Sequence, residues 1–407
     1  MWIILRVIIA IVFLVLLEYY FIKKSKGAIR QLLPNTKDKF IKIGVRIFLI
    51  IINLYPTILI SGLIYSVITK QSPSFPDSNW LDYFLIYPFW LLFILVFQLV
   101  VYYLVFDLIK ILIFPLYKKH KEKFKKYEAY LVAVLLIFFI VYIPARIIYD
   151  YNSVEVNHVA LIKNNLLNKL NNFKIVFISD VQADKYTNDK RLKNFIDKVN
   201  EEKPDLVLIA GDVITSTPKY INAAAENIGM IKSKYGVYSC IGDHDNWAYR
   251  QDTKRSLREV AAALKKYNVN MLDDTTIRVD IDGYKIGISF ITNTYVESIP
   301  EDVLQKLSQS NHSDLKIFLT HQPRKELIRA AEQNNYDLFL AGHTHGGQIS
   351  LLFPFIQLTP TLVETTFIKG ERHYGNLLAI VTRGLGMSLA PVRYNSTPEI
   401  VIITLKK

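Results

Sequence analysis

The distribution of apolar residues divides the chain into two parts. Residues 1–151 consist of long apolar runs separated by lysine clusters, whereas residues 152–407 alternate short apolar runs with polar, helix-like stretches. Four of the long runs have the length that a helix needs to cross a bilayer. They cover residues 2–22, 43–68, 84–106 and 129–149. We therefore expect an all-α transmembrane region of four helices over residues 1–151.

The basic residues of this first part predict its orientation. Seven Lys or Arg residues separate the first two runs and a cluster of six lysines from Lys118 to Lys126 lies between the last two, but the middle loop carries Lys70 with Asp77 and Asp82. Cytoplasmic loops of membrane proteins are enriched in Lys and Arg. We therefore expect an integral protein of the cytoplasmic (inner) membrane, with everything after the fourth run on the outer (periplasmic or extracellular) face. One span more or fewer would invert this prediction.

Charge and cysteine content exclude two classes of protein. The net charge of +13 lies mostly on residues 1–151, which hold 18 Lys or Arg against 8 Asp or Glu, while residues 152–407 hold 31 against 28. A nucleic-acid binder would carry the basic excess on its soluble part, so we expect no nucleic-acid partner. A single cysteine, Cys240, excludes an intrachain disulfide framework and a cysteine-rich zinc site.

The second part has the pattern of an α/β domain over residues 174–407, preceded by a linker or short lead-in over 152–173 that is rich in Asn and Lys. Apolar residues between the first two strand-like runs have the spacing of one helix face. Continuous apolar runs of this kind are typical of strands buried on both faces. Eight such runs cover residues 174–179, 205–210, 236–241, 285–291, 315–320, 338–341, 377–382 and 399–405.

Acidic and imidazole side chains follow five of these runs. They are Asp180, Asp212, the group Asp243-His244-Asp245, His321, and the pair His343 and His345. In open α/β sheets, sites form at the carboxyl ends of the strands. Converging carboxylates and imidazoles need a cation to compensate their charge. Oxygen and nitrogen ligands without cysteine suit Mn, Fe or Zn rather than calcium alone. The alternative for Asp180 and Asp212 is that they cap the following helices.

The order and spacing of these motifs resemble the calcineurin-like metallophosphoesterases, in particular their YkuE- and YaeI-like membrane-associated group. The resemblance covers residues 174–405 and implies an α/β fold, the four-layer α/β/β/α sandwich. It rests on Ser179-Asp180-Val181-Gln182, Gly211-Asp212-Val213, Gly242-Asp243-His244-Asp245, Thr320-His321, Gly342-His343-Thr344-His345-Gly346-Gly347-Gln348, and the tail from Thr382-Arg383-Gly384 to Pro398-Glu399.

The resemblance implies a role for each motif residue. One divalent ion would be held by Asp180, Gln182, Asp212 and His345, and a second by Asp212, Asp243, His321 and His343. A hydroxide bridging the two ions would attack phosphorus in line. His244 would stabilise the transition state or protonate the leaving oxygen, with Asp245 as its orienting partner. Arg383 and Arg393 would either meet the substrate phosphate or form structural ion pairs.

Two positions depart from the family pattern. Gln182 stands where the family usually has His, and Asp243 stands where it usually has Asn. The two changes exchange a nitrogen ligand for oxygen and make the site more anionic. We therefore expect two divalent ions that are Mn or Mg, with Zn and Fe as alternatives. The changes leave open whether Gln182 is a weak ligand, which would weaken the first metal site, or no ligand at all.

The leading functional prediction is hydrolysis of a phosphomonoester, phosphodiester or pyrophosphate, in a small-molecule or lipid substrate, by a membrane-anchored enzyme. Some relatives cleave UDP-diacylglucosamine, but that substrate is cytoplasmic and opposes the predicted orientation. A second hypothesis is a metal-binding sensor or scaffold that lost turnover through Gln182. A third, a transporter with a fused domain, is disfavoured because four spans without repeats or broken helices offer little pathway.

Overall fold

The computed structural model describes residues 2–70 and 78–407, so Asp77 of the middle loop lies outside the described residues. The chain forms two compact units, Met1–Ile148 and Tyr149–Lys407.

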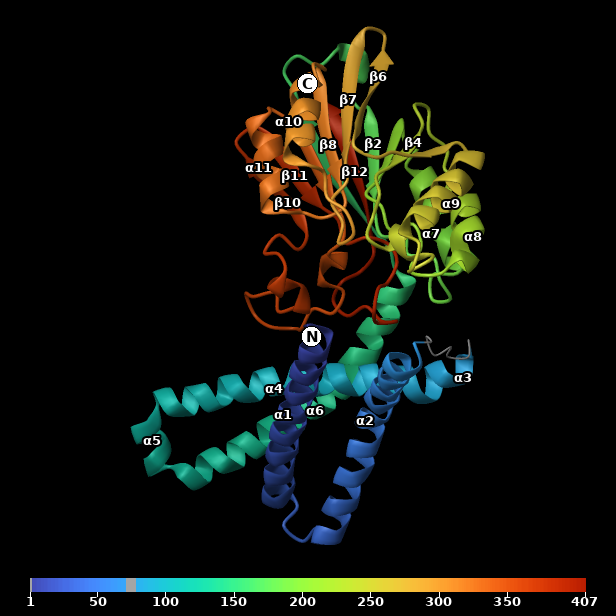
Figure 1. Cartoon of the computed structure of the whole chain (residues 1–407). Coiled ribbons are helices and arrows are strands. Elements are labelled where there is room, and N and C mark those ends of the chain that lie inside the picture. Colours follow the sequence, from blue (N-terminus) through green and yellow to red (C-terminus); the bar gives the residue numbers. More distant parts are fainter. Residues whose placement is uncertain (1, 71–77) are drawn as a thin grey trace. The chain divides into compact units, whose positions relative to one another are not determined.

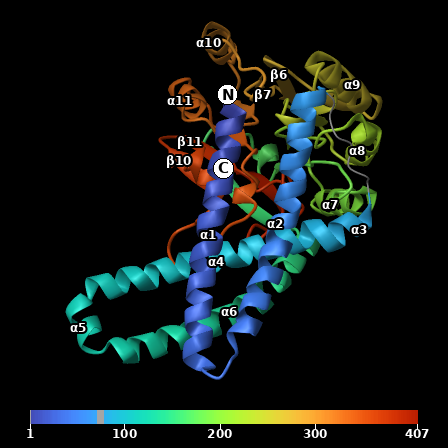
Figure 2. The same cartoon turned by 60° about the horizontal axis from the view of Figure 1, so that its bottom comes forward.

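The first unit is built from helices, and α1 and α2 both pack against α4 (Figure 1; Figure 2). Its elements are α1 (Trp2–Leu32), α2 (Asp38–Thr69), α3 (Asn79–Leu81), the π-helical turn η1 (Asp82–Ile86), α4 (Tyr87–Leu112), α5 (Phe114–Lys119) and α6 (Lys121–Asn152).

Three helical runs in the described part of the chain are long and apolar enough to cross a membrane. They are Asp38–Thr69, Asn79–Leu112 and Lys121–Asn152, and they contain the second, third and fourth predicted spans. The first predicted span, residues 2–22, lies within α1. Its crossing of the membrane stays a prediction, and so does the orientation that depends on four spans.

Charged side chains of the first unit pair with one another across helices. Lys24 of α1 lies 2.5 Å from both Asp107 of α4 and Glu128 of α6, and Lys110 lies 2.8 Å from Glu128. Ion pairs that join three helices satisfy these charges locally. They favour a structural role for Asp107 and Lys110 over a transport path.

The second unit contains two six-stranded mixed sheets. The first has the order β1-β12-β2-β3-β4-β5 and the second β10-β11-β9-β8-β7-β6. Neighbouring strands are parallel except at β12–β2, β10–β11 and β6–β7. The strands are β1 (Glu155–Ile162), β2 (Lys174–Ile178), β3 (Leu206–Ile209), β4 (Val237–Ser239), β5 (Val269–Met271), β6 (Thr275–Ile281), β7 (Tyr284–Ile291), β8 (Leu315–Thr320), β9 (Leu338–Ala341), β10 (Gly370–Tyr374), β11 (Leu377–Val381) and β12 (Glu399–Lys406).

Three apolar cores hold these sheets and their helices in four layers. One core lies between the sheets and contains Phe177 of β2 and Leu319 of β8. The other two pack helices on the outer faces, as Figure 1 shows. Helices α7 (Asp189–Glu201), α8 (Ile221–Ile228) and α9 (Thr253–Lys266) cover the first sheet, and α10 (Glu301–Ser310) and α11 (Lys325–Gln333) cover the second. The predicted α/β/β/α sandwich is confirmed.

The eight strands that the apolar runs predicted are the eight inner strands. The four remaining strands, β1, β5, β6 and β10, are the edges of the two sheets. Residues 152–173 are therefore not simply a linker, as the sequence suggested, because β1 pairs with β12 in parallel from Glu155 to Ile162. The search for continuous apolar runs missed β1 because polar residues interrupt its apolar ones, and an edge strand is covered less completely than an inner strand.

The packing of β1 generates a testable expectation. Leu161 is buried in the core between the sheets, whereas its neighbour Ile162 is 71% exposed. Leu161→Ala should lower the free energy of unfolding by about 2–4 kcal/mol, because it leaves a cavity in a packed core. The matched control Ile162→Ala should change it by less than about 0.5 kcal/mol. Urea unfolding of Tyr149–Lys407, followed by the fluorescence of Trp247, measures both free energies. Equal effects of the two substitutions would mean that β1 does not pack into the core and acts only as a linker.

Candidate metal centre

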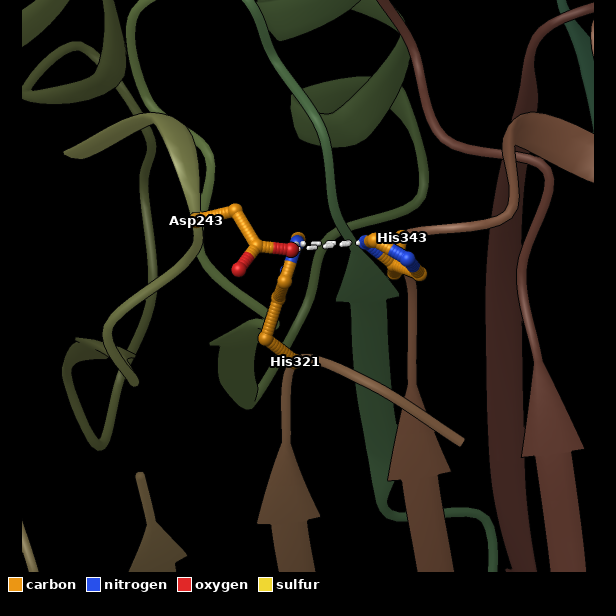
Figure 3. Close-up of side chains that lie close together, drawn as sticks. All are labelled: Asp243, His321 and His343. Carbon is orange, nitrogen blue, oxygen red and sulfur yellow. Dashed lines mark hydrogen bonds and ion pairs between the residues drawn. The ribbon is translucent and has the colours of Figure 1, made fainter. Parts of the chain in front are cut away.

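The strand-end residues of both sheets meet at one place. Asp180, Asp212 and Asp243 follow β2, β3 and β4 of the first sheet, while His321 and His343 follow β8 and β9 of the second. Parallel strands end at the same edge, so the two sheets bring their carboxyl ends together. Figure 3 shows Asp243, His321 and His343 pointing toward one another above the strand ends.

These side chains form two groups with the composition of metal sites. Asp243, His321 and His343 form one group, and Asp180, Asp212 and His321 form the other, with the ligand atoms of each group within 4.8 Å of one another. The His321 Nε2 atom lies 3.4 Å from an oxygen of Asp212 and 3.4 Å from one of Asp243. The sequence led us to expect Asp212 as the shared residue, and the structure adds His321 as a residue that belongs to both groups.

His321 is oriented by the backbone of the opposite sheet. Its Nδ1 atom lies 2.7 Å from the carbonyl oxygen of Ala210. A carbonyl can only accept, so Nδ1 carries the proton and Nε2 presents its lone pair toward Asp212 and Asp243 in the neutral ring. Metal-ligating histidines are commonly held in this way through their second ring nitrogen.

His343 is held by a carboxylate that the sequence analysis missed. The His343 Nδ1 atom lies 2.9 Å from Asp243, and its Nε2 atom lies 3.0 Å from Glu364, which also accepts hydrogen bonds from Tyr295 (2.7 Å) and Arg324 (2.8 Å). Burial opposes charge on His343, but its contacts with Asp243 and Glu364 raise its pKa to about 9. Burial likewise opposes charge on Glu364, and His343 holds its pKa down at about 2. No motif marks Glu364, because it lies in a loop between η6 (Pro360–Val363) and β10.

Asp180, Gln182 and His345 lie on the other side of the site. The His345 Nε2 atom lies 3.5 Å from Asp180, and burial together with Arg393 holds the pKa of His345 well below its usual range, so its ring is neutral. The Gln182 amide nitrogen donates to Asp212 at 2.7 Å. Its Oε1 atom is buried and has no hydrogen-bond partner within the described part of the chain. A buried acceptor without a donor is costly, and a cation would satisfy it.

The backbone around these residues is strained. Five of the seven predicted ligands have a positive φ, namely Asp180, Gln182, Asp212, His343 and His345. Residues other than glycine rarely adopt this conformation, and such residues cluster at functional sites. The glycine before His343 has a packing reason, because a Cβ atom at Gly342 would lie 2.3 Å from Ser179 Oγ and 2.5 Å from Asp180 Oδ2.

His244 and Asp245 have different partners from those expected. The His244 Nδ1 atom contacts the carbonyl oxygen of Thr215, and its Nε2 atom lies 3.0 Å from Ser388 Oγ. The Asp245 carboxylate instead accepts three backbone N–H groups, those of Asp212, Val213 and Gly242, at 2.8–3.0 Å. The expectation that Asp245 orients His244 therefore requires correction: Asp245 ties two ligand-bearing loops together, and the Thr215 carbonyl orients the imidazole.

The two arginines are occupied by structural contacts. Arg383 pairs with Glu399 at 2.9 Å and with Glu155 of β1 at 2.5 Å. Arg393 is fully buried, and its guanidinium donates to several backbone carbonyls, including that of Gly386 at 2.6 Å. Of the two readings that the sequence left open, these contacts favour the structural one. Arg324 donates to Glu364 at 2.8 Å and lines a pocket of about 920 Å³ together with Gln322.

The residues fit divalent cations. The ion pairs that the three carboxylates form within the described part of the chain are all with histidines. The pKa of Asp180 is raised, mainly by its burial, whereas His321 and His343 overcome the burial of Asp243 and hold its pKa well below its usual range. Buried carboxylates, imidazole nitrogens and an unpaired amide oxygen form a donor set for Mn, Mg, Zn or Fe.

Comparisons with known proteins agree with this site. Residues 173–347 match the family model described as calcineurin-like phosphoesterase. The chain is 32% identical to the uncharacterized metallophosphoesterase YkuE of Bacillus subtilis over 58% of this chain and 79% of that protein. It is 29% identical to an uncharacterized metallophosphoesterase of Campylobacter jejuni, over 63% of this chain and 65% of that protein.

A further relative has a name that includes a membrane part. The chain is 27% identical to the transmembrane protein with metallophosphoesterase domain of Bos taurus, over 51% of this chain and 50% of that protein. The chain thus spans between half and four fifths of the length of these relatives. The ordered motifs, the two-sheet sandwich and the match to YkuE together place it: the chain belongs to the calcineurin-like metallophosphoesterase family.

Proposed function

We propose that the chain is a membrane-anchored phosphoesterase with two divalent metal ions that hydrolyses a phosphomonoester, phosphodiester or pyrophosphate. One observation carries this proposal: buried carboxylates and imidazoles from five strand ends converge beside the Gln182 amide oxygen, which has no hydrogen-bond donor among the described residues. Divalent cations would compensate the three carboxylates and satisfy this amide oxygen. The alternative, a metal-binding sensor or scaffold that lost turnover, would have the same metal site, so turnover is the property that separates the two.

The ligand assignment follows the two groups of side chains. Asp180, Gln182, Asp212 and His345 would hold one ion, and Asp212, Asp243, His321 and His343 the other. Gln182 would offer the Oε1 atom that otherwise has no partner. Two divalent ions bound there would polarise the phosphoryl group and lower the pKa of a water that they bind, so that this water could act as a nucleophile at neutral pH. Harder oxygen ligands at Gln182 and Asp243 favour Mn or Mg over Zn or Fe.

His244 is suited to act on the leaving group. Its Nδ1–H donates to the Thr215 carbonyl, so the neutral ring accepts the Ser388 hydroxyl at Nε2. When Nε2 is protonated, the same atom becomes a donor that can stabilise negative charge on the departing oxygen and transfer its proton. The backbone carbonyl keeps this nitrogen directed outward in both states.

The membrane helices suggest where the substrate is. A domain that begins directly after a membrane-crossing helix meets substrates at the bilayer surface, which favours phosphorylated lipids or lipid-linked molecules. The lysine asymmetry of residues 1–151 supports a position of the domain on the outer face of the inner membrane.

The role of Glu364 can be tested through metal affinity. Glu364→Gln should weaken metal binding by roughly 10–100-fold, because carboxylates that hold a ligating histidine contribute about that much. The matched control Glu371→Gln changes an exposed glutamate of β10 and should leave the affinity unchanged. Competition with a chelating dye on the full chain in detergent measures both. Equal affinities would mean that His343 does not ligate through Nδ1.

The proposed activity can be tested by metal analysis together with a panel of phosphoesters. The full chain should hold about two divalent ions and hydrolyse at least one member, whereas Asp212→Asn should lose metal and at least about 100-fold in rate. Gln182→Leu should lower the occupancy of one ion only. Undiminished metal content in Asp212→Asn would contradict the shared-ligand assignment, and a metal-loaded wild type inert on the whole panel would favour a sensor.

The proposed orientation can be tested with fusions to the C-terminus. An alkaline phosphatase fusion should be active, because that enzyme matures only outside the cytoplasm, and a fusion to green fluorescent protein should be dark. The reverse pattern would place the domain in the cytoplasm. A nucleotide-linked lipid such as UDP-diacylglucosamine would then be the first substrate to assay.

A further inference from the structure

An exposed apolar surface lies on two loops of the second unit. No charged residue occurs from Ile349 to Val363. Within this loop, Phe355 and Val363 are fully exposed, at 106% and 97%, and Leu352, Ile356 and Leu362 are partly exposed. On a second loop, Leu389 is 95% exposed. We call these six residues the apolar rim. Soluble surfaces seldom carry so many exposed apolar side chains together unless they bind something.

Local folding does not explain two residues of the rim. Phe355 has φ 66° and Leu389 has φ 63°, both in the left-handed region. Turns in this conformation favour Gly, Asn or Asp, which relieve the backbone or bond to it locally. Large apolar residues at two such turn tips, on separate loops, point to a function for the side chains themselves.

Both loops of the rim adjoin the candidate site. Val363 precedes Glu364, whose carboxylate contacts His343 at 3.0 Å. Leu389 follows Ser388, whose hydroxyl lies 3.0 Å from His244. The Gln348 amide joins the bases of the two loops by donating to the carbonyls of Ser388 and Ala390 at 2.9 Å. Whatever the rim binds is therefore held next to the metal centre.

The bases of the same loops are connected to the end of α6. The carboxylate of Asp150, in the last turn of α6, accepts hydrogen bonds from the Thr397 hydroxyl at 2.6 Å and the Ser396 backbone at 3.4 Å. The preceding residue, Asn395, donates to the Ser350 carbonyl at 2.9 Å through its side-chain amide. All these contacts lie within the second unit, so this unit begins, at the last turn of a helix long and apolar enough to cross a membrane, beside the bases of the loops that carry the rim.

We propose that the apolar rim docks into the bilayer in which the helices lie, so that the metal centre acts on the phosphate of a membrane lipid. The inference rests on the proposed membrane anchoring and deepens the proposed function by naming its substrate class. An uncharged loop with aromatic and aliphatic tips suits the headgroup boundary of a bilayer. A lipid held there keeps its chains in the membrane and its phosphate level with His343 and His244.

Fluorescence quenching tests the docking independently of activity. Cys240 is the single cysteine and is buried, so a cysteine introduced at position 355 or 389 can be labelled selectively. In nanodiscs of phosphatidylethanolamine and phosphatidylglycerol, an environment-sensitive dye on Phe355→Cys or Leu389→Cys should shift to shorter wavelength and lose emission when doxyl-labelled lipid is included. The matched control is Met230→Cys, which is 47% exposed directly after α8 and should show neither change.

The outcomes of this experiment distinguish a bilayer from a second copy of the chain as the partner of the rim. Labels at positions 355 and 389 that respond no more than the label at 230 would overturn the proposal. A wavelength shift that appears in detergent and grows with protein concentration, without lipid quenching, would also overturn it in favour of a second copy of the chain.

Activity on two substrates tests the link to lipids. In the double variant Phe355→Asn with Leu389→Asn, the new residue suits both left-handed turns, so the fold should be kept. Hydrolysis of phosphatidic acid in vesicles should fall at least about tenfold, because two apolar anchors are lost. Hydrolysis of bis(p-nitrophenyl) phosphate in detergent should be unchanged, and so should both activities of Met230→Asn. Equal loss on both substrates, or no loss on either, would refute the rim as a lipid-docking surface. A wild type inactive on both would refute the proposed function while leaving the quenching result to stand.

Discussion

The structure depends on the cost of placing like charges together in a buried site. Asp180, Asp212 and Asp243 lie within one site at the ends of three neighbouring strands, each almost completely buried. Their ion-pair partners among the described residues are histidines, which hold a full positive charge only when protonated. Divalent cations would compensate the negative charge of the three carboxylates. The stability of the site and the proposed hydrolysis therefore both call for bound metal ions.

The loops around the site hold the ligands in place. Asp245 joins the second and third ligand loops through three backbone N–H groups, the Ala210 carbonyl sets the ring of His321, and Glu364 sets the ring of His343. Positive φ values at five predicted ligands show that the backbone conformation serves the site rather than local preference. Two packed sheets supply the rigidity that such strain requires.

The end of the last helix is continuous with the phosphoesterase-family domain. Apolar helices long enough to cross a membrane precede a phosphoesterase-family domain, and β1 and the contacts of Asp150 join the end of the last helix to that domain. The apolar rim, the polar site and the end of α6 are connected by hydrogen bonds through residues 394–397. The proposed docking of the rim depends on this continuity within the second unit.

The sequence by itself determined the inner architecture and the residues of the site. Inner strands are buried on both faces, so their continuous apolar runs identified all eight of them, and Asp or His at the strand ends identified the ligand candidates. The tertiary structure alone revealed the four edge strands, because their polar alternation resembles that of loops. It alone assigned Glu364 and the Thr215 carbonyl to the histidines, separated Asp245 from His244, and showed that Arg383 and Arg393 are already paired. Each of these depends on contacts between segments far apart in the chain, and the local pattern of residues carries no record of which distant partner a side chain meets.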